Sequence, residues 1–183
     1  VLPTFFFLTP ESTFAANRFH LVLFNNTGGF NVRLLLLVFM PSNTARTGVL
    51  PSAFTLRRRI GPTTNPAGGL ITAIAADSDD VIPSTLTGHA VPTTAPAGGT
   101  AQDLFPFVPQ ADEIKLSTLD GPTFTSLQPF CGNHIYNANA FRPARPFLVR
   151  PQQTLEVQQS GTAGTGQGRF LAVVSLADMY AKV

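Results

Sequence analysis

One stretch of the chain reads FNVRLLLLVFM, from Phe30 to Met40. Successive side chains of a β-strand point to opposite faces, so a strand with one face in water alternates between apolar and polar residues. Every residue from Leu34 to Phe39 is apolar, which predicts a central strand covered on both faces. One cover would be the core of the protein itself. The other cover, on this interpretation, is another subunit.

The residues just before this strand, Asn25 to Gly29, read NNTGG. A turn rich in Asn and Gly between two apolar runs is typical of a β-hairpin. We therefore expect residues 18–24 and 30–40 to pair as a hairpin.

Short apolar and β-branched runs recur along the rest of the chain, separated by Pro, Gly, Asn and Thr. This pattern favours many short antiparallel strands, and Pro and Gly interrupt the sequence too often for long helices. Besides the two strands above, we expect strands at residues 4–8, 54–60, 70–76, 85–91, 102–108, 113–119, 123–130, 133–141, 146–149, 154–159 and 169–176.

The fold class follows from this pattern and from the length of 183 residues, which suits one domain with its own core. We predict a single all-β domain over residues 1–183, an antiparallel β-sandwich of jelly-roll type. Residues 1–12 would form an extended N-terminal segment, and the residues from Ala177 onward a short C-terminal tail.

The composition favours contacts between surfaces over chemistry. Hydrophobic residues make up 44% of the chain and charged residues 12%, about half the usual charged share of roughly 25%. Ten of the twelve basic residues are arginine, which tolerates burial at interfaces better than lysine does. A net charge of +2 is no nucleic-acid footprint, so nucleic acid is an unlikely partner. The longest apolar run is too short to cross a bilayer, and no membrane association is expected.

Arg57, Arg58 and Arg59 form the densest basic run, inside the predicted strand at 54–60. Alternation places Arg58 on the face that carries Phe54 and Leu56, and it places the other two arginines on the opposite face. Phosphate binding needs several basic side chains on one face. We therefore favour an interface strand in which Arg58 meets a carboxylate or carbonyls of a neighbour, with nucleic-acid binding as the alternative.

A second arginine group, near residues 141–151, is interleaved with Pro and Phe. Because proline cannot donate to a sheet ladder, this pattern predicts an extended edge strand. Such an edge either receives a partner strand or is blunted against one. The residues that we assign to this group and to the interface are Phe141, Arg142, Arg145 and Phe147.

Metal and catalytic chemistry has few candidates. Asp77, Asp79 and Asp80 could offer oxygen ligands to Ca²⁺, but they lack the glycine and distal glutamate of an EF-hand loop, and a solvated turn is the favoured interpretation. The three histidines have no metal-ligand spacing. Cys131 has His134 three residues later, on opposite sides of a strand but within reach on a turn. We expect no enzyme, no cofactor and no bound metal.

Two octamers, PTTNPAGG at residues 62–69 and PTTAPAGG at residues 92–99, differ at one position. They could record a duplicated strand–loop unit. Pro, Thr and Gly recur in loops in any case, so the octamers alone predict loops and no repeat fold.

Two regions carry a resemblance to known proteins. FTLRRRI at 54–60, the GPTTNPAGG loop and DSDD at 77–80 resemble parts of small β-rich virion proteins of tailed bacteriophages. FLVRPQQTLEVQQ, the Gly-rich stretch after it and RFLAVVSL are similar to the closing hairpin of jelly-roll and related capsid-associated folds. The resemblance implies a capsid, head-decoration or tail component that assembles as a symmetric oligomer, and it carries over no functional residue.

From these observations we expect a virion structural protein, a capsid or head-decoration component, that packs with copies of itself and with other virion proteins. A tail-tube or fibre component is one alternative. A carbohydrate-binding adhesin is another, although it needs exposed aromatic rings and the chain has no Trp and only Tyr136 and Tyr180. The expected interface comprises Leu35, Leu37, Phe39, Arg57, Arg58 and Arg59 together with the four residues of the second arginine group.

Overall fold

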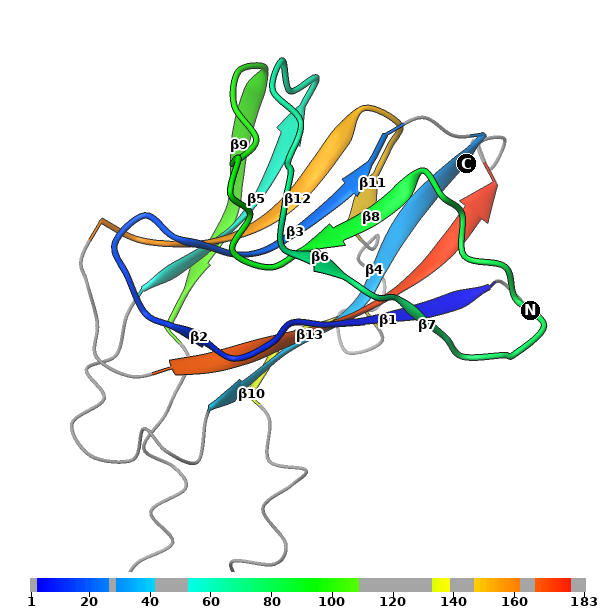
Figure 1. The fold of residues 1–183 in the computed structure, drawn as a ribbon, viewed down its shortest axis with the longest axis horizontal. Helices are drawn as coiled ribbons and strands as arrows, with labels where there is room; N and C mark the ends of the chain where they lie inside the picture. Colours follow the sequence, from blue (N-terminus) through cyan, green and yellow to red (C-terminus); the bar gives the residue numbers. More distant parts are fainter. Residues whose placement is uncertain are drawn as a thin grey trace, which may run out of the picture.

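The structure is a computed structural model, and it describes residues 3–26, 29–41, 53–108, 133–138, 147–161 and 167–178. These residues form two antiparallel β-sheets and no helix, and the sheets are the two layers of a β-sandwich (Figure 1). The predicted all-β fold class is confirmed. The predicted strands at 113–119 and 123–130 lie outside the described residues. The predicted C-terminal tail begins too early, because Ala177 and Asp178 belong to a strand, and its remaining residues lie outside the described part.

The seven-stranded sheet contains the apolar strand at 30–41 in a central place, as predicted. Two short strands extend it, with β11 (Leu148–Val149) paired to β4 and β2 (Ser12–Thr13) paired to β13. Its main strands run in the order β10 (Asn133–Asn137), β4 (Phe30–Pro41), β13 (Gln167–Asp178), β1 (Thr4–Leu8) and β7 (Ile74–Ala75).

The six-stranded sheet contains the basic strand at 54–60. Its strands run in the order β6 (Leu70–Ile71), β8 (Leu86–His89), β3 (Phe19–Asn25), β12 (Gln153–Gln159), β5 (Phe54–Ile60) and β9 (Thr100–Phe107).

The predicted hairpin of residues 18–24 and 30–40 is wrong, because β3 and β4 belong to different sheets. β3 pairs with β12 and β8, while β4 pairs with β13 and β10. The segment 160–168, which we expected at the tip of a closing hairpin, likewise joins β12 to β13 across the two sheets. Each of these strands is central and needs a partner on both sides, and its partners come from distant parts of the sequence.

The predicted strand at 70–76 is divided in two. β6 pairs with β8 in one sheet and β7 pairs with β1 in the other, so this segment crosses from sheet to sheet at their edge. The aspartates that follow form a turn, as predicted, in which the Asp80 amide donates to the Asp77 carbonyl at 3.1 Å.

The core between the sheets is dominated by phenylalanine. The rings of Phe39 and Phe170 lie 5.2 Å apart, and those of Phe54 and Phe170 lie 5.6 Å apart in an edge arrangement that aromatic pairs favour. Phe5 and Phe7 of β1 are equally enclosed. A β-bulge at residue 35 adjusts β4 to this core, since Leu34 pairs with Val174 but Leu36 pairs with Val173.

Candidate functional site

The two octamers pair with each other. Thr64 bridges to Ala97 and Ala67 bridges to Thr94, in antiparallel fashion, and the two loops lie side by side beyond β5 and β9 (Figure 1). The Thr64 and Ala97 backbones exchange hydrogen bonds of 3.1 and 3.2 Å, and those of Ala67 and Thr94 exchange two of 3.1 Å. We call this paired unit, residues 62–69 with residues 92–99, the clasp.

The clasp has an approximate two-fold symmetry that relates residues 30 positions apart. His89 donates through Nδ1 to the Gly68 carbonyl at 2.8 Å, and the corresponding Arg59 donates through Nη1 to the Gly98 carbonyl at 3.0 Å. A Cβ at Gly68 would overlap Thr93. A Cβ at Gly98 would overlap Thr63 in the same way, so the octamers need glycine at equivalent places.

The clasp covers part of the outer face of the six-stranded sheet. Arg59 and His89 both point to that face, as do Val22 and Phe24, and all four side chains are buried. On an uncovered antiparallel sheet, outward positions such as these would be in water. This part of the molecule is therefore closed by its own chain.

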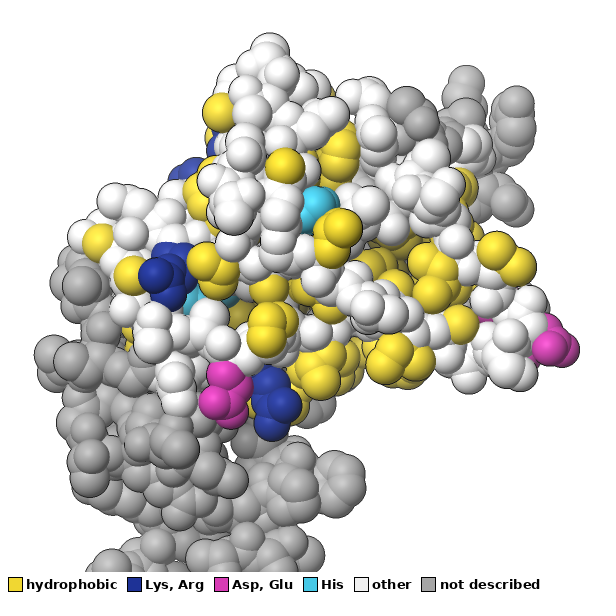
Figure 2. Space-filling model, viewed as in Figure 1, with side chains coloured by type: hydrophobic (Ala, Val, Ile, Leu, Met, Phe, Trp, Pro, Cys, Tyr) yellow, Lys and Arg dark blue, Asp and Glu magenta, His cyan; other side chains and the backbone are white. Residues whose placement is uncertain are grey.

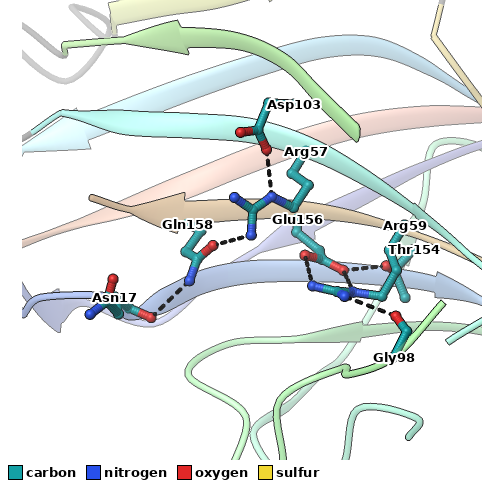
Figure 3. A network of polar contacts seen from close by, with 8 residues as sticks. All are labelled: Asn17, Arg57, Arg59, Gly98, Asp103, Thr154, Glu156 and Gln158. Atoms are coloured by element: carbon teal, nitrogen blue, oxygen red, sulfur yellow. Dashed lines mark hydrogen bonds and ion pairs between the residues drawn. The ribbon is translucent and has the colours of Figure 1, made fainter. Parts of the chain in front are cut away.

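A buried ion pair lies on the covered face (Figure 3). Arg59 Nε donates to Glu156 Oε1 at 2.8 Å and Arg59 Nη2 donates to Glu156 Oε2 at 3.2 Å, a two-point contact. Thr154 Oγ1 donates to Glu156 Oε1 at 2.6 Å. The glutamate is fully enclosed, and the pair links β5 to β12 and, through Gly98, to the clasp.

The arginine that meets a carboxylate in a buried site is therefore Arg59 and not Arg58, and the carboxylate belongs to the same chain. The predicted alternation is correct, since Phe54 and Leu56 point to the core. Arg58 lies on that face as well, but near the end of β5, where its Nη2 donates to Gln102 Oε1 at 2.6 Å. The clasp explains the difference, because it buries the outward face of β5 at Arg59.

Arg57 lies on the same outward face as Arg59 but is only half-buried. Its Nε meets Asp103 Oδ1 at 2.6 Å and its Nη1 donates to Gln158 Oε1 at 2.5 Å (Figure 3). Gln158 in turn donates to the Asn17 carbonyl. All three arginines of the basic run are thus engaged by side chains of their own subunit.

The other expected interface residues fall in different places. Leu37 and Phe39 belong to the core of the subunit, and Leu35 is half-buried at the bulge. Phe147 is half-buried with its ring 4.8 Å from that of Tyr136. Phe141, Arg142 and Arg145 lie outside the described residues.

The outer face of the seven-stranded sheet is apolar over much of its area, and two of its side chains, Val38 and Val173, are already buried within the subunit. The register places Phe6 between Ile74 and Val173, and it places Leu171 between Leu8 and Val38. Ile74 is 61% exposed and Leu8 is 40% exposed. Figure 2 shows hydrophobic side chains gathered over β1 and β7. We call this surface the apolar face: Phe6, Leu8, Leu36, Val38, Met40, Ile74, Leu171 and Val173.

Charged side chains stand at three margins of the apolar face. Arg33 lies beyond Leu36 on β4, Arg169 lies beyond Leu171 on β13 in register with Met40, and the aspartate turn at 77–80 follows β7. The Asp77 carboxylate accepts from the Asp79 amide at 3.1 Å, a local turn contact. Among the described residues no group of three or more His, Cys, Asp or Glu side chains is placed to hold a metal ion.

His20 is enclosed in the core, where Ser12 Oγ lies 2.8 Å from Nδ1 and Gln159 Oε1 lies 3.1 Å from Nε2. Since the Gln159 oxygen can only accept, Nε2 carries the proton and the Ser12 hydroxyl donates to Nδ1. Burial lowers the pKa of His20 to about 4; the Gln159 contact opposes this shift and the charge of Arg18 adds to it. The ring is a neutral link between strands, while Cys131 and the side chain of His134 lie outside the described residues.

Comparisons of the chain with known protein families, curated proteins and solved structures identify no match. The part of the chain that the structure describes contains no helix able to span a membrane.

Proposed function

We propose that this chain is a jelly-roll structural subunit of a virus or phage particle, a capsid or head-decoration component that assembles with copies of itself. The observation that carries the proposal is the connectivity of the eight longest strands. Each of these strands in the first half of the chain pairs with one that lies later in the chain: β1 with β13, β3 with β12, β4 with β10, and β5 with β9.

Winding these four pairs around one core gives two four-stranded arrays, β10-β4-β13-β1 and β3-β12-β5-β9. Eight antiparallel strands in two such arrays support the proposed jelly roll, an architecture that recurs in viral capsid and lectin domains. Because a fold does not by itself fix a function, the surfaces have to decide between these uses.

The surfaces favour assembly. The apolar face holds eight apolar side chains, with Arg33, Arg169 and the aspartate turn at its margins, which a subunit that always has neighbours can carry. The adhesin alternative would need aromatic rings in water, but the Tyr136 ring is buried in the core and only 7% of the residue is exposed. Tyr180 lies outside the described residues.

The test is the assembly state of the purified protein. Sedimentation velocity and light scattering over a concentration series should find a closed oligomer or larger particle, and electron microscopy of that fraction should separate shells from tubes or fibres. A protein that stays monomeric up to its solubility limit would refute the proposal. Tubes or fibres would favour the tail-component alternative.

A further inference from the structure

We propose that the apolar face is a contact between two copies of this chain, related by a two-fold axis that runs along the strands. This inference rests on the proposed function, since it names the partner and the surface through which one assembly contact forms. A contact of this kind uses the same patch on both copies.

The first argument is the contrast between the two sheets. The clasp covers outward side chains such as Val22 and Phe24 with the subunit's own loops. On the seven-stranded sheet, Val38 and Val173 of the apolar face are buried, whereas Ile74 and Leu8 stay 61% and 40% exposed although their neighbours across the strands are apolar as well. An antiparallel sheet that faces water carries polar residues at such positions.

The second argument is the placement of charge. One row across the sheet runs from Arg33 through Ser175 to Thr4, and the Ala76 amide donates to the Thr4 carbonyl. The row therefore has a cation on β4 and leads, beyond β7, into the aspartate turn at 77–80. Three strand spacings separate the two ends, about 14 Å. Within the described residues neither Arg33 nor the aspartates of the turn have an ion-pair partner.

These charges select a second copy as the occupant. A two-fold axis along the strands reverses the row, so that Arg33 of one copy faces the aspartate turn of the other, and the same contact occurs twice. The apolar rows through Phe6 and through Leu8 then meet their own equivalents. Contact between apolar side chains would supply the affinity, and the paired charges would fix the register between the two copies.

Two sets of variants test this contact in the full chain. Leu8→Glu with Ile74→Glu places charge in the apolar face at positions that are already exposed, so folding should be unaffected. Leu70→Glu is the matched control, because Leu70 is 73% exposed but lies on the six-stranded sheet. We expect the double variant to weaken self-association at least tenfold in sedimentation velocity, and the control to associate like the wild type.

The charge pairing has its own test. Arg33→Glu should weaken association, and adding Asp79→Arg to the same chain should restore it, because each copy then presents both reversed charges. If the wild type assembles and all these variants assemble equally well, the inference is overturned while the proposed function stands. If the wild type itself never associates, the proposed function fails first.

Discussion

Val91 lies immediately before the second half of the clasp, as Gly61 lies immediately before the first. Both lie one residue before the proline of their octamer, and both have left-handed backbone, with φ of 44° at Val91 and 59° at Gly61. A β-branched residue is strained in this region. The symmetry of the clasp thus imposes on Val91 a conformation that its side chain disfavours.

Val91→Gly should therefore stabilise the protein. Relief of left-handed strain, about 1–3 kcal/mol, exceeds the entropic cost of glycine, about 0.5–1 kcal/mol. Urea denaturation should show a net gain of about 1 kcal/mol. The mirror variant Gly61→Val meets open space, since nothing lies within 4 Å of its Cβ, and it should lose stability through the backbone alone. A loss of stability in Val91→Gly would contradict a strained backbone at Val91.

Gly68→Ala and Gly98→Ala should destabilise the protein to a similar extent, about 1–3 kcal/mol each, because each added methyl overlaps a threonine of the opposite octamer. Gly61→Ala is the control for left-handed backbone without an overlap, and Gly161→Ala is the control for neither, its nearest neighbour being 3.7 Å away. Thermal unfolding of the four variants would measure this. Unequal losses of stability at Gly68 and Gly98 would show that the two equivalent contacts differ in energy.

Glu156→Ala should cost about 3–5 kcal/mol of unfolding free energy, because it leaves the Arg59 guanidinium buried without its carboxylate. Asp103→Ala removes the partner of Arg57 from a pair in which the Asp103 side chain is 59% exposed, and it should cost less than about 1 kcal/mol. Replacing both members of the buried pair, with Arg59→Met and Glu156→Leu, should recover much of the loss. Urea denaturation compares the three directly, and equal losses for the two single variants would speak against a buried pair.

Acid should destabilise the fold through His20. Its folded pKa of about 4 lies below the ordinary value of 6.5, so between these values the unfolded chain binds a proton that the folded chain refuses. The contribution of neutral His20 to the unfolding free energy is fully present above pH 6.5. It falls as the pH drops toward 4, by up to about 3 kcal/mol. Unfolding at a series of pH values would show this slope, and His20→Gln should flatten it between pH 6.5 and 5. An unchanged slope in the variant would assign the acid sensitivity to other groups.

Much of the strand pattern follows from the sequence because it rests on local alternation. The prediction for residues 54–60 agrees with β5 at both ends, and residues 4–8 agree with β1. Alternation also identifies the inward faces of Phe54 and Leu56. These properties depend only on which side of a strand each residue occupies.

Pairing between distant strands is not contained in that pattern. The NNTGG turn has the residues of a hairpin, yet it carries the chain from one sheet to the other, because β3 and β4 each have better partners elsewhere. The burial of Arg59 depends on the second half of the clasp, where its partner Gly98 lies 39 residues further along, and no local signal indicates it. The near-identity of the octamers was the available signal, and their mutual pairing gives it a physical meaning.

Because the chain is folded in half, the strands that must find each other are separated by very different lengths of polypeptide. β5 and β9 are the innermost couple, whereas β1 has to wait for β13, more than 150 positions later. During synthesis the ribosome must release the chain as far as β13 before the outermost pair of strands can form, and such long-range pairing is slow. Among the paired strands, β1, with its three consecutive phenylalanines, thus spends the longest time without its partner strand during synthesis. It is the segment that we expect to depend most on a chaperone.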